Sequence, residues 1–287
     1  MIDGLAVVDK PAGWTSHDVV ARCRKIFGQK RVGHSGTLDP DATGVLLVGL
    51  GRVTRLLRFL TDLPKSYEGE VVLGVATSTL DASGDVVQAW DMSSVTLDQL
   101  RAAARALTGP ILQVPPMVSA VKVDGKRLHD LARQGIEVER KPRPVTVHRF
   151  DIARSALVEA GSPVHPISVD CSSGTYIRTL AADLGQAVGG GAHLRNLRRT
   201  AIGSFVVADA VPLESLTPAD VVSPAEALRD YPCTVVDAEG VAAVGFGRSL
   251  PVVPDIQGPY RVLDTDGRLV AVYEGSRPAV VLAPAGT

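Results

Sequence analysis

Two carboxylates stand two positions apart in a loop-like stretch of the sequence, residues 33–44, which is GHSGTLDPDATG. An Asp before Pro in a Gly-rich segment commonly forms a turn, because its carboxylate accepts hydrogen bonds from nearby backbone N–H groups. The order Asp39-x-Asp41-x-Thr43 is also the spacing of aspartyl-phosphate phosphatases, in which one Asp is the nucleophile and the other an acid or base. Such a loop would follow a buried apolar strand, whereas His-Ser-Gly-Thr-Leu precedes Asp39 here. Spacing alone therefore does not decide whether this stretch is a structural turn or carries a reactive carboxylate.

Strand-like and helix-like segments surround this loop and alternate without a fixed repeat period, which argues against a solenoid or a propeller. Residues 5–8 predict a short strand, and Ser16 is placed to cap a helix that Gly28 ends. Residues 30–44 are dense in Gly, Ser, Thr, Asp and Pro and predict a loop. Further predicted elements are a strand over 67–75, a helix opened by the Thr96/Gln99 capping box and ended at 109–110, a strand over 167–171 and a helix after residue 174 with Arg178 in its first turn.

The residue pattern changes beyond about residue 228, where short Val-rich segments that predict strands are separated by Gly and Pro. This pattern is typical of a small β-barrel. Residues 122–145 are charged, turn-rich and weakly periodic, so we expect a loop or an excursion there. Mixed elements with an antiparallel character, followed by this barrel, predict an α+β domain and a C-terminal β module.

The composition excludes several classes of protein. With 287 residues, 45% of them hydrophobic and 21% charged, the chain is predicted to be globular rather than disordered or fibrous. Three widely spaced cysteines, Cys23, Cys171 and Cys233, indicate neither a disulfide framework nor a zinc site, and they fit a reducing cytoplasm. No apolar run is long enough to span a membrane, and the N-terminus lacks the pattern of a signal peptide.

The net charge of −1 argues against a protein that coats nucleic acid through bulk charge. The charges are nevertheless unevenly distributed along the chain. Residues 1–60 carry +4, residues 120–154 carry +4 and residues 176–204 carry +3, whereas residues 205–287 carry −6. Charge runs are usually solvated faces, but three basic blocks in an otherwise neutral chain predict a local positive surface.

Six stretches between about residues 5 and 205 resemble, in the same order, the motifs of the TruB family of tRNA pseudouridine synthases. An ordered set of this kind is far more specific than any single motif. The stretches are VVDKPAGWTS from residue 7, GHSGTLDPDATGVL from residue 33, Lys65-x-Tyr67, SAVKVDGKR from residue 119, CSSGTYIRTL from residue 171 and GAHLRNLRRT from residue 191.

The resemblance implies that a uridine in the T loop of tRNA, conventionally numbered 55, is converted to pseudouridine without cofactor or metal. Because the glycosidic bond must break and a bond from C5 to C1′ must form, the chemistry requires a carboxylate as nucleophile or charge stabiliser. The resemblance assigns this role to Asp39, with uracil C6 and ribose C1′ both open as the atom attacked. It assigns Arg178 as the cation that keeps the carboxylate charged. Tyr67 matches the residue that stacks on the uracil and is a candidate for removing the C5 proton.

An enzyme that acts on a base must take that base out of the stack. By resemblance, His34 lies near the vacated base, and Tyr176 and Leu197 line the uracil pocket. A solvated loop His, a core Tyr and a core Leu are the ordinary structural alternatives for these three positions. The RNA also needs cations where its phosphates pass. The basic residues that we expect at the RNA are Arg55, Lys122, Lys126, Arg127, Arg198 and Arg199.

The family's fold is the expected architecture: an α+β, mixed and mostly antiparallel sheet flanked by helices, plus a small PUA-like β-barrel. The expected domains are residues 1–228, with a thumb-like insertion at about 122–145, and residues 229–287. The expected partner is the T stem-loop of tRNA, and we expect a cytoplasmic monomer that uses no membrane and no metal. The acidic charge of the C-terminal module predicts that it contributes little RNA affinity.

Two other functions remain as alternatives. A non-catalytic RNA-binding or tRNA-folding protein would use the same basic groove, and an Asp39→Asn substitution would leave its function intact. An aspartyl phosphatase would need Mg²⁺ and no RNA, but the sequence shows no distinctive downstream acidic pair for the metal. The leading interpretation is the RNA-modifying isomerase.

Overall fold

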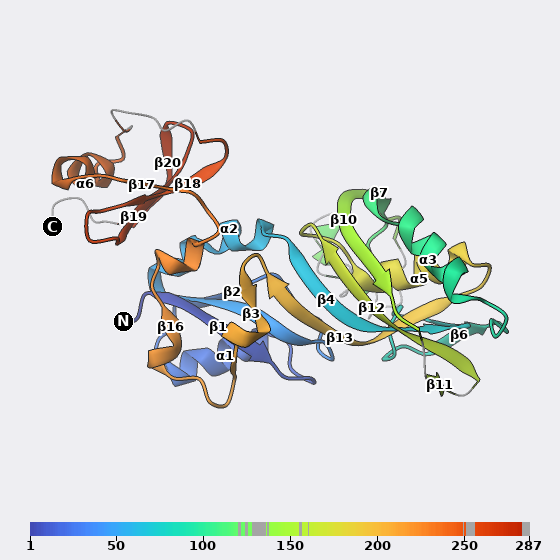
Figure 1. Ribbon diagram of the computed structural model, residues 1–287. Helices are drawn as coiled ribbons and strands as arrows, with labels where there is room; N and C mark the ends of the chain where they lie inside the picture. The colour runs from blue at the N-terminus through green and yellow to red at the C-terminus, as the bar shows by residue number, and fades with distance from the viewer. Residues whose placement is uncertain are drawn as a thin grey trace. The chain divides into compact units, whose positions relative to one another are not determined.

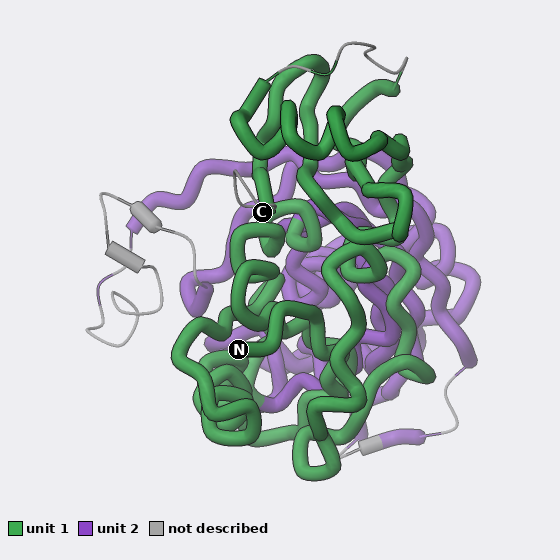
Figure 2. The backbone as a smooth tube through the Cα atoms, turned by 90° about the vertical axis from the view of Figure 1, so that its left-hand side faces the viewer, with its two compact units in different colours: residues 1–40, 44–61, 203–287 green, residues 41–43, 62–202 purple. Residues whose placement is uncertain are grey.

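The computed structural model describes residues 1–119, 122–123, 126–127, 136, 138–154, 157–159, 161–248, 250 and 256–282. The chain divides into two compact units, coloured separately in Figure 2. Unit 1 comprises residues 1–40, 44–61 and 203–287, and unit 2 comprises residues 41–43 and 62–202. Within the described part of the chain, no helix combines the length and the apolar character that crossing a membrane requires.

The sheet of unit 1 is built on β1 (Gly4–Lys10), which pairs antiparallel with β3 (Thr43–Leu50) along its whole length (Figure 1). The other edge of β1 pairs with β15 (Val211–Pro212) and β16 (Val221–Val222). On the far side of β3 lies β2 (Val32–Ser35), within the stretch that the sequence predicts to be a loop. The prediction was wrong there because β3 supplies backbone partners that local composition does not reveal.

Helix α1 (Ser16–Ile26) packs its apolar side on this sheet, where Val19, Val20 and Cys23 are buried. The sequence predicts Ser16 as its cap, but the N-cap is Thr15. The Thr15 hydroxyl accepts from the Asp18 backbone N–H at 3.1 Å, and the Asp18 carboxylate accepts from the Thr15 N–H at 2.9 Å. This reciprocal pair satisfies two backbone donors at the helix start and leaves the Ser16 hydroxyl available for another contact.

The sheet of unit 2 is entirely antiparallel along its main path. Its five strands follow in the order β13 (Ala192–Ile202), β4 (Lys65–Leu73), β12 (Ser162–Cys171), β10 (Arg143–Ile152) and β7 (Gly109–Gln113). The expected α+β class with a mixed, mostly antiparallel sheet is therefore confirmed. The shorter strands of this unit are β5 (Val75–Thr77), β6 (Val86–Ala89), β8 (Lys122–Val123), β9 (Lys126–Arg127) and β11 (Leu157–Glu159).

Two helices pack on one face of this sheet and on each other: α3 (Leu97–Ala106) lies against β10, and α5 (Ile177–Ala187) lies against β13. The predicted capping box of α3 is confirmed, since the Thr96 side chain accepts from Gln99 N–H and the Gln99 side chain accepts from Thr96 N–H. Helix α5 starts where the sequence places it and carries Arg178 in its first turn.

A separate four-stranded sheet lies near the C-terminus and has its own core around Tyr260, Val262 and Tyr273. It has the Val-rich strands that the sequence predicts, and it also contains a helix, α6 (Ala238–Gly245), which the sequence analysis missed. The Asp237 side chain caps α6 by accepting from Gly240 N–H at 2.9 Å, a local signal that could have revealed it. The strands follow in the order β17 (Cys233–Val235), β18 (Pro259–Leu263), β19 (Leu269–Glu274) and β20 (Arg277–Val281).

The C-terminal part of unit 1 is held by hydrogen bonds with the segment that follows β3. Arg52 donates from Nη1 to the Leu282 carbonyl at 2.8 Å, and the Tyr231 hydroxyl donates to the Phe59 carbonyl at 2.8 Å.

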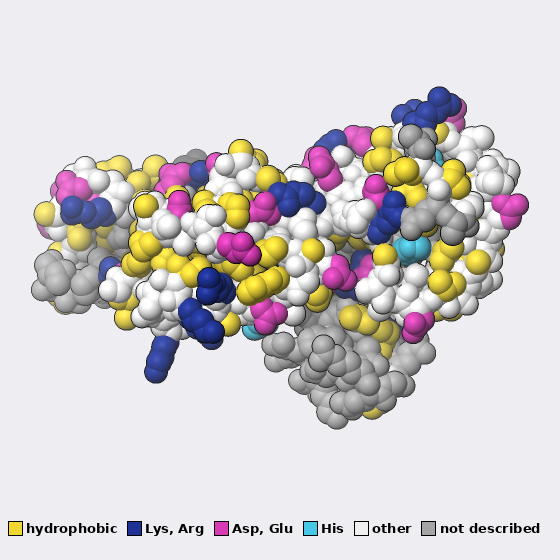
Figure 3. All heavy atoms as spheres, turned by 90° about the horizontal axis from the view of Figure 1, so that it is seen from below, with side chains coloured by type: hydrophobic (Ala, Val, Ile, Leu, Met, Phe, Trp, Pro, Cys, Tyr) yellow, Lys and Arg dark blue, Asp and Glu magenta, His cyan; other side chains and the backbone are white. Residues whose placement is uncertain are grey.

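Acidic and basic side chains are interspersed over the face shown in Figure 3. The remaining short elements are η1 (Gly51–Arg55), α2 (Leu57–Asp62), β14 (Phe205–Val206), η2 (Val207–Asp209), η3 (Pro218–Asp220) and η4 (Glu226–Leu228).

Candidate active site

The loop that carries Asp39 is fixed on its N-terminal side by Ser16 of α1. The Ser16 hydroxyl accepts from the Leu38 backbone N–H at 2.9 Å and donates to the Leu38 carbonyl at 3.2 Å. Both groups are buried, with Leu38 only 3% exposed and Ser16 only 1% exposed. Because Ser16 lies on a helix, it holds the residue before Asp39 against a rigid element.

The same loop is fixed on its other side by Lys10, which is fully buried at the end of β1. The Lys10 ammonium donates to the carbonyls of Pro11 at 2.9 Å, Trp14 at 2.6 Å and Pro40 at 2.8 Å. Its three donors are thus matched by three acceptors. Asp39 therefore stands between two anchored neighbours. Lys10 and Ser16, from the motif at residues 7–16, hold the motif at residues 33–44 in place.

We expect Ser16→Ala to lower both stability and turnover. The substitution leaves the buried Leu38 N–H and carbonyl without their partner, which costs about 1–2 kcal/mol of unfolding free energy. Urea unfolding measures this loss, and single-turnover product formation measures the misplacement of Asp39. The control is Ser93→Ala, since Ser93 is an exposed serine whose hydroxyl bonds to the exposed Asp91. Equal effects of the two substitutions would contradict the anchoring role of Ser16.

Arg178 is buried in unit 2 at 5% exposure, and its guanidinium joins α5 to two other segments of that unit. Nη1 donates to the Thr79 carbonyl at 3.0 Å, and Nη2 donates to the Val118 carbonyl at 2.8 Å. Nη1 also lies 3.5 Å from a carboxylate oxygen of Asp81. The planar, rigid fork of an arginine suits a site at which several acceptors must be met at fixed angles.

Asp81 is itself held in place by a tight turn. One carboxylate oxygen accepts from the Thr79 hydroxyl at 2.6 Å, and from the Ser83 backbone N–H at 3.1 Å and hydroxyl at 2.6 Å. The other oxygen faces Arg178. Sequence reasoning missed Asp81 as a site residue. The Thr-x-Asp-x-Ser pattern signals such a turn, but nothing local connects it with an arginine 97 positions later.

Gln113 of β7 fixes the start of α5. Its side-chain oxygen accepts from the Tyr176 N–H at 2.7 Å, and its side-chain nitrogen donates to the Tyr176 carbonyl at 3.1 Å. Gln113 is 1% exposed, so these bonds form away from water. The predicted pocket residue Tyr176 and the first turn with Arg178 are thereby positioned together. Sequence reasoning missed Gln113 as well.

Tyr67 lies on β4 directly opposite Val169 of β12 and Arg199 of β13. Residues that are directly opposite in an antiparallel pair share a face of the sheet, so Tyr67 and Arg199 belong to one face. Both are buried, Tyr67 at 8% exposure and Arg199 at 1%. The predicted Leu197 lies in an irregular stretch of β13, where the pairing register with β4 shifts between Arg195 and Arg198.

Family models match almost the entire chain in consecutive segments. Residues 24–177 match the TruB family pseudouridylate synthase N-terminal domain. Residues 178–232 match the tRNA pseudouridylate synthase B C-terminal domain, and residues 231–283 match the C-terminal domain of tRNA pseudouridine synthase II. The chain belongs to the TruB family. The resemblance of its six motifs is therefore confirmed.

Curated relatives of this TruB-family chain match it along nearly its whole length. The tRNA pseudouridine synthase B of Mycobacterium tuberculosis (strain ATCC 25618 / H37Rv) is 47% identical over 293 residues, which are 98% of this chain and 96% of the relative. The protein of the same name from Arthrobacter sp. (strain FB24) is 42% identical over 299 residues, which are 99% of this chain and 98% of the relative. A pseudouridylate synthase activity follows from this degree of similarity.

Solved structures show the same fold at lower identity. A chain of the crystal structure of a Cbf5-Nop10-Gar1 complex superposes with a TM-score of 0.72 at 26% identity, over 98% of this chain and 85% of that one. A chain of the crystal structure of the archaeal box H/ACA sRNP Nop10-Cbf5 complex superposes with a TM-score of 0.71 at 25% identity, over 99% of this chain and 87% of that one. The expected pseudouridine-synthase architecture with a PUA-like C-terminal part is thereby confirmed.

His34 of the TruB chain lies on β2, opposite Val48 of β3. Its ring meets the ring of His17 edge to face, with the centroids 5.3 Å apart and the planes at 83°. His17 is the second residue of α1. The predicted base-replacing residue is thus oriented by a strand on one side and by a helix-borne ring on the other.

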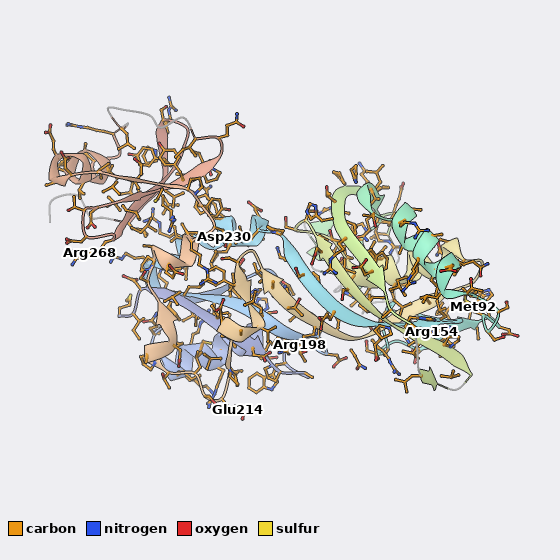
Figure 4. All side chains as sticks on the ribbon, in the orientation of Figure 1. Met92, Arg154, Arg198, Glu214, Asp230 and Arg268 are labelled. Carbon is orange, nitrogen blue, oxygen red and sulfur yellow. The ribbon has the colours of Figure 1, made fainter. Side chains whose placement is uncertain are left out.

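The predicted RNA-binding cations occupy different settings. Arg55 donates to the Val281 carbonyl of β20 at 2.7 Å, so it also holds the C-terminal sheet. Arg198 of β13, labelled in Figure 4, donates to the Thr43 hydroxyl at 3.2 Å and is half-buried, whereas its neighbour Arg199 is buried. For Lys122, Lys126 and Arg127 only the backbone is described, as the β8–β9 hairpin, and their side chains and the rest of 120–135 lie outside the described residues.

Burial lowers the pKa of Lys65 on β4 to about 8, with a further lowering by the nearby Arg199 guanidinium. Lys65 is 6% exposed, and its ammonium donates to the Leu63 carbonyl at 2.8 Å.

Among the residues that the structure describes, no three His, Cys, Asp or Glu side chains gather as metal ligands would.

The lowered pKa of Lys65 predicts a stability that rises in alkali. Below about pH 8 both the folded and the unfolded chain hold this proton. Between about 8 and 10.5 the unfolded chain holds it and the folded chain releases it, so folding is favoured as the pH rises. Across this range the unfolding free energy of wild type should therefore rise by about 2–3 kcal/mol relative to that of Lys65→Met. Urea unfolding at a series of pH values measures the difference, and a constant difference would contradict the pKa.

Proposed function

We propose that this TruB-family enzyme converts a uridine in the T loop of tRNA, conventionally numbered 55, to pseudouridine. The observation that carries the proposal is the Asp39 loop, anchored by Ser16 on one side and Lys10 on the other. The family match over nearly the whole chain and relatives named tRNA pseudouridine synthase B support the choice of substrate.

The proposed chemistry uses Asp39 as nucleophile or charge stabiliser. The bond from ribose C1′ to N1 of the base breaks, the base turns, a bond from C1′ to C5 forms, and the hydrogen on C5 leaves as a proton. Atoms are conserved between substrate and product, so neither a redox partner nor a group donor is required. Arg178 is the proposed cation for the Asp39 carboxylate, and its rigid mounting on α5 supports that role.

The proposed substrate contacts follow the family motifs. Tyr67 stacks on the uracil, Tyr176 and Leu197 line its pocket, and His34 lies near the space that the base vacates. The fixed backbone of Tyr176 and the ring contact of His34 with His17 support these assignments. The phosphates are assigned to Arg55, Lys122, Lys126, Arg127 and Arg198. Arg199, which the sequence also places at the RNA, is 1% exposed and is therefore not assigned to a phosphate.

We also propose a cytoplasmic monomer whose catalytic part ends near residue 228 and whose PUA-like part is residues 229–287. All three cysteines are free, and two are buried, which suits a reducing compartment. The four-stranded C-terminal sheet begins at Cys233, and the third family model begins at residue 231, which supports the boundary.

Tritium release tests the proposed function. Unmodified tRNA carrying 5-tritiated uridine is incubated with the enzyme in the presence of EDTA, because pseudouridine formation must expel the C5 hydrogen. The expected result is the release of tritium equivalent to one uridine per tRNA. A folded protein that binds the tRNA and releases none would instead be an RNA-binding or tRNA-folding protein.

A further inference from the structure

Two cations of unit 2 are buried on the sheet face that carries Tyr67. Lys65 is 6% exposed and Arg199 is 1% exposed, which makes Arg199 the largest fully buried side chain among the described residues. Burying a charge is costly, and burying two of the same sign close together costs more, because they also repel each other. Two buried cations on one face of a sheet point to a role in function beyond packing.

The strand register places both cations next to Tyr67, one on the neighbouring strand and one on the same strand. Arg199 of β13 lies directly opposite Tyr67 of β4, and Lys65 lies two residues before Tyr67 on the same strand. Residues two apart along a strand share a face, and directly opposite residues have Cβ atoms roughly 4.5–5.5 Å apart. The phenol ring therefore shares its face of the sheet with an ammonium and a guanidinium.

The groups that act on Lys65 come from three neighbouring elements. The Arg199 guanidinium on β13 lowers the pKa of Lys65, whereas the Cys171 thiol on β12 and the Asp62 carboxylate on α2 raise it. Burial is the largest cause and brings the pKa to about 8. Lys65 is therefore a cation at neutral pH.

We propose that Lys65 and Arg199 are positioning residues for Tyr67, whose phenolate form they stabilise so that its oxygen takes the proton from C5 of the base. The proposal rests on the proposed function and specifies how the last step of that reaction is assisted. Tyr67 enters the step as phenolate, its own proton having passed to solvent.

The proton transfer balances without a further reactant. The C5–H bond of the rearranged base breaks, the O–H bond of Tyr67 forms, and the electron pair of the C–H bond restores the C5=C6 double bond. A buried cation stabilises the anion more strongly than an exposed one does, because little water screens the pair. Lys65 supplies a charge that depends on pH, and Arg199 supplies one that does not.

The test compares tRNA carrying 5-deuterated and ordinary uridine under single-turnover conditions. In Lys65→Met we expect product formation to fall by about 10²-fold, the low end for an assisted proton transfer. We also expect a deuterium isotope effect larger than that of wild type, because removal of the C5 proton becomes rate-limiting. A general loss of packing would slow the reaction without raising the isotope effect. Arg268→Met, at an exposed position in the turn between β18 and β19, is the control and should match wild type.

Lys65→Arg provides a second test that avoids the loss of a buried charge. Because arginine keeps a permanent positive charge at this position, Lys65→Arg should retain most of the wild-type single-turnover rate, whereas Lys65→Met should not. In a Tyr67→Phe background, Lys65→Met should cause little further loss, because its effect acts through the phenol oxygen.

The outcomes separate this inference from the proposed function. If wild type forms no pseudouridine, the proposed function fails. If wild type is active and Lys65→Met leaves the isotope effect unchanged, or if Lys65→Arg loses as much turnover as Lys65→Met, the assignment of Lys65 is wrong. Additive losses in the Tyr67→Phe background would also overturn it.

Discussion

Asp39→Asn is expected to abolish pseudouridine formation while leaving tRNA binding within a few-fold of wild type. The amide has nearly the shape of the carboxylate, so the anchors at Leu38 and Pro40 remain in place. It lacks the negative charge and the nucleophilic oxygen that the rearrangement requires. The loss in single-turnover rate should be on the order of 10⁴-fold, as when a catalytic group is removed from an otherwise intact site. Tritium release measures the rate, and filter binding measures the affinity.

Asp41→Asn is the matched control, because Asp41 is an exposed carboxylate two residues further along the same loop. It removes the same charge with the same change of shape, and turnover should stay close to that of wild type. If both variants lose activity to the same extent, the loop acts through its overall charge and the assignment of Asp39 is wrong. If neither loses activity, the carboxylate chemistry lies elsewhere.

Arg178→Lys is expected to have the second largest effect, a loss of about 10²–10³-fold in turnover, which is typical of losing a preorganised donor. A lysine keeps the charge, but its compact ammonium cannot reach the Thr79 and Val118 carbonyls in the geometry of the guanidinium fork. The loss of these two hydrogen bonds from a buried guanidinium should also lower the unfolding free energy by about 1–3 kcal/mol. Single-turnover tritium release and urea unfolding measure the two losses.

Arg101→Lys serves as the control, since Arg101 is an exposed arginine of α3 whose Nε donates to the Ile152 carbonyl at 3.3 Å. Its turnover should stay near that of wild type. Asp81→Asn should reproduce part of the Arg178→Lys defect, because it weakens the ion pair but spares both carbonyl contacts. If Arg178→Lys keeps full turnover while losing stability, the residue serves the fold rather than the reaction.

Several local features of the fold were predictable because the residues that specify them are neighbours. The Thr96/Gln99 capping box, the end of α1 at Gly28 and the Val-rich C-terminal strands depend on contacts within a few positions. Gly28 adopts φ +60°, a left-handed conformation that glycine reaches without steric cost. The cap of α1 was also open to local reasoning: Asp18 stands three residues after Thr15 and completes a capping box with it, whereas Val19 stands three residues after Ser16.

The sequence by itself determined the family and the reaction class, because motifs record the residue types that the chemistry needs. It also predicts Asp39 and Arg178 as residues of the site. The tertiary structure alone decided what holds those residues. Gln113 meets Tyr176 across 63 positions, and Arg178 meets Thr79 across 99. The register of β4 with β13 put Arg199 beside Tyr67 and gave Arg198 a different setting. Strand register and long-range hydrogen bonds arise from the packing of the whole sheet, and a slip of one residue would turn every side chain to the other face, so no local pattern specifies them.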